Sequence, residues 1–201
     1  MKKLLIAIFV LAAISTASGQ DSFSIGPKIG YNSNTLTNNL DSIQASINNS
    51  FQIGAFMRIG SRFYIQPEVN YQVTKGTVSK NSGASVLTQN YRLQTIKIPA
   101  LLGVRLLKGG VINFRIMAGP ALTYVIDKQL EPSIVDDLWP VKSVDDIKNS
   151  TWSMQAGAGV DVLFMTLDVR YELGLNNMYD GSGSFKLKNN VFNVSLGVKL
   201  L

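Results

Sequence analysis

The sequence of 201 residues contains no cysteine and no histidine. Without cysteine, the chain cannot form a disulfide or a thiolate metal site. Without histidine, it lacks the side chain that most often acts as a general base. The Gly-x-Ser-x-Gly segment that presents a serine nucleophile is also missing. These absences argue against an enzyme, and we expect no catalytic residues and no cofactor.

Calcium is the remaining metal to consider, because it needs only oxygen ligands. Asp136-Asp137 and Asp145-Asp146 are the candidate pairs, both in a long polar tract. Their spacing is not that of an EF-hand, and a solvated acidic loop explains them better. We expect no metal site.

A long hydrophobic run is also missing. The first 20 residues combine Lys2 and Lys3, 11 apolar residues from Leu4 to Ile14, and a small-residue STASG segment. This layout is typical of a secretory signal peptide, whereas a membrane helix needs about 20 apolar residues. No cysteine follows to accept a lipid anchor. The sequence therefore predicts a signal peptide at residues 1–20 and one exported domain at residues 21–201.

Charge is modest as well. Without the lysines at positions 2 and 3, the 19 basic residues become 17 against 13 acidic ones, a net charge of +4. This excess is small and scattered, so we expect no nucleic-acid partner. No later run approaches 20 apolar residues, so any crossing of a membrane must use strands.

The sequence does contain long stretches in which apolar and polar side chains alternate. Residues 51–73 alternate apolar and polar side chains through two arms that meet at Gly60-Ser61, which predicts a β-hairpin with one apolar face. Each arm has about the length of a tilted membrane strand. The apolar positions are Phe51, Ile53, Ala55, Met57, Ile59, Phe63, Ile65, Pro67, Val69, Tyr71 and Val73.

Alternation recurs until eight strands are predicted. The further runs are 23–32, 95–107, 111–125, 152–164, 166–175 and 191–201. Long polar tracts at 33–50, 74–90, 127–150 and 176–189 alternate with short turns at Gly60-Ser61, Lys108–Gly110 and Phe164-Met165. The fold class predicted is an all-β, eight-stranded, antiparallel up-and-down transmembrane β-barrel, closed because closure protects the edge strands.

Two irregularities are expected within these strands. Tyr91 and Leu93 are out of phase with the apolar residues that follow them, which predicts a bulge near Gln94–Thr95. Prolines also interrupt the runs, and they must lie at bulges or water-facing ends, or shorten the ladder locally. These prolines are Pro27, Pro67, Pro99 and Pro120.

The polar face is assigned to the lumen and the apolar face to lipid. Nine glycines share the polar face, which indicates a crowded surface rather than one in water. The apolar face carries no charge in any predicted strand, unlike the outside of a soluble barrel. The predicted lumen charges are Lys28, Arg58, Glu68, Lys97, Arg105, Arg115, Asp161, Asp168, Arg170, Glu172 and Lys199.

Aromatic residues gather near the predicted strand ends, as expected for the two girdles of a membrane barrel. The girdle next to the long tracts comprises Tyr31, Phe51, Tyr71, Tyr91, Tyr124, Trp152 and Phe192, and the girdle next to the turns comprises Phe23, Phe63 and Phe114. A general preference of aromatics for strands is the alternative, but it does not explain clustering at the ends.

Several motifs together resemble one family. FYIQPEVNY (63–71), IKIPALLGVRL (96–106), MAGPALTY (117–124), AGAGVDV (156–162), DVRYELGLNN (168–177) and VFNVSLGVKL (191–200) are similar, in this order, to PorT-like outer-membrane β-barrels of Bacteroidetes-type bacteria. The resemblance implies an eight-stranded barrel of the OmpA/OmpX kind in the outer membrane of a gram-negative cell. It implies lipid and lipopolysaccharide as surroundings and the barrel-assembly machinery as a partner during biogenesis. It assigns no extracellular loop partner.

Pairing about the turn at Phe164-Met165 predicts a charge cluster. Asp161 would lie opposite Asp168, so cations must separate the two carboxylates. The same register places Lys199 beside Asp168, Arg115 beside Asp161, and Arg170 on the diagonal. The predicted cluster of Arg115, Asp161, Asp168, Arg170 and Lys199 would plug the turn-side half of the lumen.

The sequence thus favours a non-enzymatic outer-membrane barrel with a structural or surface-interaction role. Its N-terminus would be periplasmic and its long loops extracellular. Three alternatives stay open: a narrow pore, a component of a secretion or assembly complex, and a soluble periplasmic lipocalin-like carrier.

Overall fold

The computed structural model describes residues 23–38, 43–47, 49–81, 86–109, 111–130, 148–176 and 187–200. The predicted signal peptide and the two acidic pairs considered for calcium lie outside these residues. Within them, no helix is long and apolar enough to cross a membrane. The strands are β1 (Phe23–Asn38), β2 (Ile43–Ile47), β3 (Ser50–Ile59), β4 (Phe63–Asn81), β5 (Val86–Gly109), β6 (Ile112–Leu130), β7 (Ser150–Val162), β8 (Met165–Gly174) and β9 (Leu187–Val198).

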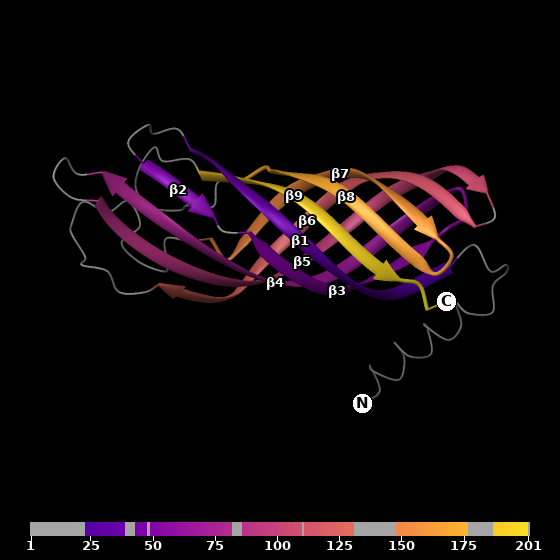
Figure 1. Ribbon diagram of the computed structural model, residues 1–201, viewed down its shortest axis with the longest axis horizontal. Helices are drawn as coiled ribbons and strands as arrows, with labels where there is room; N and C mark the ends of the chain where they lie inside the picture. The colour runs from indigo at the N-terminus through magenta and orange to yellow at the C-terminus, as the bar shows by residue number, and fades with distance from the viewer. Residues whose placement is uncertain are drawn as a thin grey trace, which may run out of the picture.

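Eight of these strands close into an antiparallel barrel. The order β4-β3-β1-β9-β8-β7-β6-β5 is completed by pairing of β4 with β5, which leaves no free edge along the barrel wall. The short strand β2 adds to β4 outside this ring, between Ile43↔Lys80 and Ile47↔Gly76. Figure 1 shows the tilted strands, with β2 and the tips of β4 and β5 at one end and the C-terminus at the other. The predicted fold class is confirmed.

The strands are longer than the alternation predicts. β4 and β5 pair as far as Asn81↔Val86, and β1 and β9 as far as Asn38↔Leu187. The tracts 33–50, 74–90, 127–150 and 176–189 are therefore partly strand rather than wholly loop, which corrects the expectation. Both faces of a strand are polar once it leaves lipid, so hydrophobic periodicity reveals only the part inside the apolar band.

The turns lie at the end of the barrel here called the turn end, and the opposite end is called the loop end. Two turns are close to their predicted places, between Ile59 and Phe63 and between Gly109 and Ile112. The third turn is at Leu163–Phe164, one residue earlier than predicted. Leu163 has a φ of 54°, in the left-handed region that a tight hairpin turn requires.

Register shifts occur in the β5–β6 ladder. One lies between Gln94 and Thr95, where a bulge is predicted, and another between Arg105 and Leu107. The reasoning behind the first was wrong, however. Leu93 is only 6% exposed and lies in the interior with Thr95, so β5 keeps its phase and Ile126 of β6 is the extra residue.

Three of the four prolines, Pro67, Pro99 and Pro120, lie at or beside local gaps in the ladders, which is one of the three solutions expected, whereas Pro27 stays paired with Ala55 in an unbroken register. Pairing of β4 with β5 stops at Pro67↔Ala100 and resumes at Asn70↔Lys97. Pairing of β5 with β6 stops at Pro99↔Ala121 and resumes at Leu102↔Ala118. Proline has no N–H to donate, so these bridges are lost without a shift of register.

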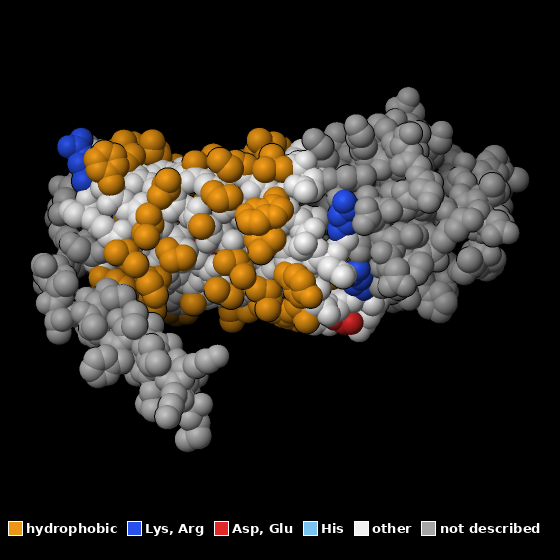
Figure 2. Space-filling view, turned by 180° about the vertical axis from the view of Figure 1, so that it is seen from behind, with side chains coloured by type: hydrophobic (Ala, Val, Ile, Leu, Met, Phe, Trp, Pro, Cys, Tyr) orange, Lys and Arg blue, Asp and Glu red, His pale blue; other side chains and the backbone are white. Residues whose placement is uncertain are grey.

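The two faces of the wall are separated by type of side chain. Large apolar residues such as Phe51 and Phe63 are about three-quarters exposed, at 75% and 76%. Polar and charged residues of the opposite parity are buried. Figure 2 shows the hydrophobic side chains as a wide band, with lysine and arginine side chains beyond both of its edges. Such an inverted distribution fits a wall surrounded by lipid and a lumen lined by polar groups.

Candidate functional site: a charge network in the lumen

Seven charged side chains meet in the turn-side half of the barrel. Each is carried by an inward position of a strand, and each is at most 3% exposed. They are connected by salt bridges without a break. We call them the lumen charge network: Lys28 (β1), Arg58 (β3), Glu68 (β4), Arg115 (β6), Asp161 (β7), Asp168 and Arg170 (β8).

Asp168 is the centre of this network. Its Oδ2 accepts from Arg170 Nη2 at 2.6 Å and lies 3.4 Å from Lys28 Nζ, while its Oδ1 accepts from Arg115 Nη2. Three cations therefore surround one carboxylate that is 2% exposed. Buried charges persist only when they are paired and hydrogen-bonded in this way.

Glu68 is a second centre on the opposite wall. Its carboxylate accepts from Lys28 Nζ at 3.0 and 3.1 Å and from Arg170 Nη1 at 3.0 Å. The amides of Gln66 and Asn70 donate to it at 2.7 and 3.1 Å. The polar neighbours on its own strand thus satisfy the oxygen lone pairs that the cations leave open.

Two ion pairs cross the full width of the barrel. Arg170 of β8 binds Glu68 of β4, and Arg58 of β3 binds Asp161 of β7 at 2.8 Å. In each case the two strands are four apart in a ring of eight, which places them on opposite sides. The pairs therefore brace facing walls and occupy the middle of the lumen.

The predicted register around Asp161 was wrong. Because the turn lies at Leu163–Phe164, Asp161 pairs with Thr166, and Asp168 pairs with Gly159. The two carboxylates are therefore not direct neighbours. Arg115 still joins them, since its Nε donates to Asp161 Oδ1 at 3.0 Å while its Nη2 binds Asp168.

The predicted position of Lys199 was also wrong. Ser195 is the β9 partner of Asp168, and Lys199 lies beyond the end of β9, where its N–H donates to the Phe164 carbonyl at 2.7 Å. Arg115, Asp161, Asp168 and Arg170 are brought together as predicted, but Lys199 forms no salt bridge with them. Lys28, Arg58 and Glu68, expected only as separate lumen charges, complete the network instead.

A cation–aromatic stack closes the network toward the turn end. The guanidinium carbons of Arg58 and Arg105 lie 5.2 and 5.5 Å from the centre of the Tyr64 ring. Arg58 also lies 5.5 Å from the ring of Phe56. A Cβ atom at Gly103 would collide with Tyr64, so glycine is needed there for the ring to fit. The parity of Tyr64 and Phe56 in the sequence places them in the lumen but does not reveal the stack.

Toward the loop end, one further ion pair spans the lumen. Lys97 Nζ lies 2.7 Å from Glu172 Oε2, which also accepts from Gln155 at 2.9 Å. Beyond it the buried inward residues that the structure describes are neutral, whereas the half-buried Lys128, the cross-strand partner of the inward Leu93, is charged. The hydrogen bonds of the neutral residues join adjacent strands, as between Asn32 and Gln52 at 3.2 Å.

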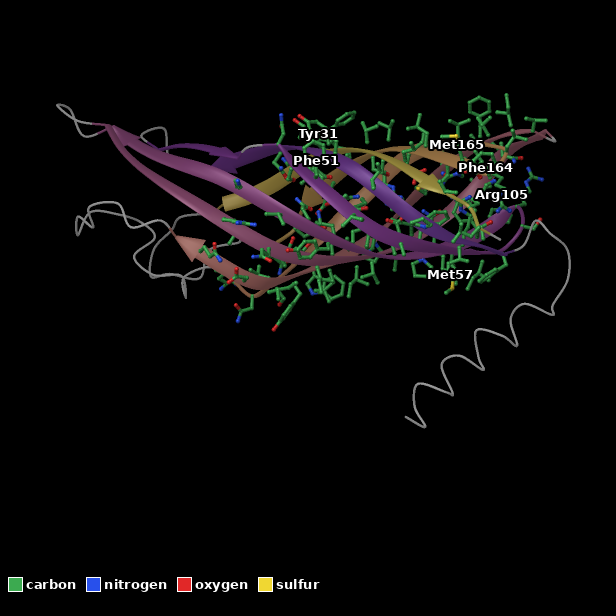
Figure 3. The ribbon with its side chains drawn as sticks, turned by 60° about the horizontal axis from the view of Figure 1, so that its bottom comes forward. Tyr31, Phe51, Met57, Arg105, Phe164 and Met165 are labelled. Carbon is green, nitrogen blue, oxygen red and sulfur yellow. The ribbon has the colours of Figure 1, made fainter. Side chains whose placement is uncertain are left out.

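The predicted aromatic residues lie on the outer wall. In Figure 3, Tyr31 and Phe51 are neighbours partway along the barrel, and Met57, Phe164 and Met165 lie near the turn end. The side chain of Tyr91 is outside the described set. The other members of the girdle next to the long tracts are at least 38% exposed, namely Tyr31, Phe51, Tyr71, Tyr124, Trp152 and Phe192.

The chemistry that this arrangement can perform is limited. Each carboxylate of the network is bound to at least two cations, which leaves none poised as a base. Among the described residues, no group of three acidic side chains could hold a metal ion. The arrangement therefore supports a structural role, in which the salt bridges hold the barrel walls together, more than a catalytic role.

Comparison with known proteins identifies the family. A model of the outer membrane protein β-barrel domain matches residues 17–180, which is most of the chain. The chain belongs to this family. It is therefore an outer-membrane β-barrel protein, as its inverted faces indicate.

Solved structures of similar shape are distant in sequence. Ail from Yersinia pestis, in complex with the heparin analogue sucrose octasulfate, has 10% identity and a TM-score of 0.45, covering 89% of this chain and 99% of that one. The translocator domain of NalP from Neisseria meningitidis has 13% identity and a TM-score of 0.35, covering 98% and 95%. LpxR from Salmonella typhimurium has 8% identity and a TM-score of 0.34, covering 86% and 99%. No curated protein matches the sequence.

Proposed function

We propose that this protein is a non-enzymatic structural barrel of the outer membrane whose lumen is closed by the charge network, leaving its loop end to act at the cell surface. The observation that carries the proposal is the pair of salt bridges across the full width of the barrel, Arg170–Glu68 and Arg58–Asp161. An eight-stranded barrel has an interior just wide enough for side chains. Two ion pairs across its centre leave no continuous path for ions.

Conductance is the direct test, because a narrow pore is the second function that the lumen could serve. Cations outnumber carboxylates in the network by four to three, so a pore would prefer anions. We expect purified protein in planar bilayers to give almost no current. Steady, anion-selective currents from the wild-type protein would reject a closed lumen and establish the pore.

Location and folded state can be tested together. The protein should fractionate with outer membranes and migrate differently on gels with and without boiling, as a stable barrel does. Recovery as a soluble periplasmic monomer would instead favour the lipocalin-like carrier.

Orientation is the third part of the proposal. Even-numbered barrels with an N-terminal strand that starts in the periplasm place their short turns there and their longer loops outside. Epitope tags within the tracts 33–50, 74–90, 127–150 and 176–189 should therefore be detected on intact cells. A tag at Gly109 should be detected only after permeabilisation, and its detection on intact cells would reverse the orientation.

A role in a secretion or assembly complex stays an alternative, in line with the resemblance to PorT-like barrels. Affinity purification from gently solubilised membranes distinguishes a barrel that acts alone from a subunit of a complex. A barrel that acts alone should co-purify with lipid and without stoichiometric protein partners, whereas a subunit should co-purify with the same protein partners in fixed proportion.

A further inference from the structure

The outer wall of the barrel carries an apolar groove of about 740 Å³. It follows one row of outward side chains that are direct partners across five neighbouring strands: Leu167, Leu196, Ile29, Ile53 and Tyr71. Ile29 and Ile53 are both 60% exposed, so the row forms an open floor rather than a closed core. We call this feature the wall groove.

The wall groove rises toward the loop end as it crosses the strands. At one end, Leu167 lies two residues from the start of β8 at the turn end. At the other end, Tyr71 lies eight residues from the start of β4. Tyr31 and Phe51 form its upper side through an edge-to-face contact, with ring centroids 5.4 Å apart (Figure 3). The groove then ends beside Lys75, which belongs to its lining.

Two cations face each other at this upper end. Lys75 of β4 and Arg92 of β5 are direct cross-strand partners, and both are exposed on the outer wall. Like charges directly opposite one another destabilise a sheet unless an anion lies between them. Neither residue forms a salt bridge with any residue that the structure describes. The carboxylate of Asp127 is already bound by the amides of Gln94 and Gln129, at 2.8 and 2.9 Å.

An apolar channel that ends at a pair of cations matches a lipid with an anionic head. The groove can hold an acyl chain along the wall, because its floor is made of exposed apolar side chains such as Ile29 and Ile53. Lys75 lies four residues beyond Tyr71 on β4, toward the loop end where head groups lie, and a phosphate between Lys75 and its partner Arg92 would relieve their repulsion. Free phosphate could bind the two cations but would leave the apolar groove empty, so a lipid accounts for more of the site than phosphate does.

We propose that the wall groove and the Lys75–Arg92 pair form a binding site for one phosphorylated glycolipid of the lipid A class. An acyl chain occupies the groove, and a phosphate lies between the two cations. The assignment of the lipid rests on the proposed orientation, because it is the outer leaflet of the outer membrane that is built of such glycolipid. Binding at the site itself does not depend on whether the lumen conducts.

The test uses the full folded barrel in nanodiscs of phosphatidylcholine doped with lipid A, with retained lipid counted by native mass spectrometry. We expect the double variant Lys75→Gln/Arg92→Gln to bind lipid A about 30-fold more weakly, given the attraction typical of two basic side chains near an anionic surface. Wild-type protein should bind dephosphorylated lipid A just as weakly. Ile53→Trp, which fills the groove and keeps both cations, should also reduce retention.

Arg62→Gln is the matched control, since it removes one exposed cation at the turn end, and it should retain lipid A like the wild type. The substituted side chains all lie outside the lumen, so each variant is expected to fold. Normal heat-modifiable migration on gels checks this.

Equal retention of lipid A by the double variant and by the control would overturn the site. Equal retention of phosphatidylglycerol and lipid A would overturn the glycolipid assignment, leaving only general attraction to anionic lipid. A conducting wild-type barrel with normal lipid A retention would reject the closed lumen and leave this site standing.

Discussion

The two halves of the lumen are built on different principles. In the turn-side half, salt bridges link strands on opposite walls, as Arg170 and Glu68 do. In the loop-side half, beyond the Lys97–Glu172 pair, neutral amides and hydroxyls bond to the adjacent strand, as Asn32 does to Gln52 and Asn193 to Asn32. The turn-side contacts therefore act across the barrel, whereas the loop-side contacts only reinforce ladders that the backbone already forms.

This contrast has a consequence for which contacts the fold depends on. A charge in the turn-side half cannot reach water when its partner is removed, so a broken pair leaves a buried, unpaired ion. A loop-side amide loses one hydrogen bond between strands that remain paired through their backbones. We therefore expect the turn-side half to dominate the response of stability to substitution.

Asp168→Ala should have the largest effect, because it leaves Lys28, Arg115 and Arg170 around an empty position. We expect the free energy of unfolding to fall by about 3–5 kcal/mol, the usual cost of removing one partner of a buried ion pair. Urea unfolding of the barrel in lipid vesicles measures it, and planar bilayers should stay almost silent. Asp127→Ala, on the outer wall, is the control and should change little. Equal effects of the two variants would contradict the central role of Asp168.

A pair of double-mutant cycles compares the two halves directly. For Arg58→Met and Asp161→Leu, we expect a coupling free energy of about 2 kcal/mol, since the pair spans the barrel and is buried. For Asn32→Ala and Gln52→Ala, we expect about 0.5 kcal/mol, as for a neutral hydrogen bond between paired strands. Similar coupling in both cycles would show that the halves do not differ in the way described.

Glycine substitutions test how tightly each half is packed. Gly103→Ala should cost about 1–3 kcal/mol, because its methyl group would collide with the Tyr64 ring, which the guanidinium groups of Arg58 and Arg105 contact. Gly30→Ala should cost less, because its methyl group would meet Gln52 Cγ at 2.9 Å, on a flexible side chain. Thermal unfolding in detergent ranks the two. Partial rescue of Gly103→Ala by Tyr64→Leu would locate the clash, and a larger loss at Gly30 would reverse the ranking.

Ser195→Ala should have the smallest effect, although Ser195 is the cross-strand partner of Asp168. Its buried hydroxyl has no hydrogen-bond partner among the described residues, so removing it forfeits no bond. The free energy of unfolding should change by less than about 0.5 kcal/mol, or rise slightly. A loss above 1 kcal/mol would mean that the hydroxyl belongs to the network after all.

Several features of the barrel could be predicted from the sequence because each depends on parity or on order along the chain. The alternation in 51–73 and its repeats predicted the eight strands of the barrel wall, although not the added strand β2, and the uncharged apolar parity indicated which face meets lipid. The inward parity of Lys28, Arg58 and Glu68 likewise placed these charges in the lumen. The number of barrel strands and the side of the wall on which a residue lies can be predicted without knowing which distant parts of the sequence meet in the folded barrel.

What only the tertiary structure decided is which lumen charges touch. A turn placed one residue too late moved Asp168 opposite Asp161 in the predicted register, whereas its true partner is Gly159. The bridges Arg58–Asp161 and Arg170–Glu68 join residues more than 100 positions apart. They form only because closure brings opposite walls together. Strand alternation fixes the side of the wall on which a residue lies, but the partner across the lumen depends on the tilt and stagger of the closed barrel.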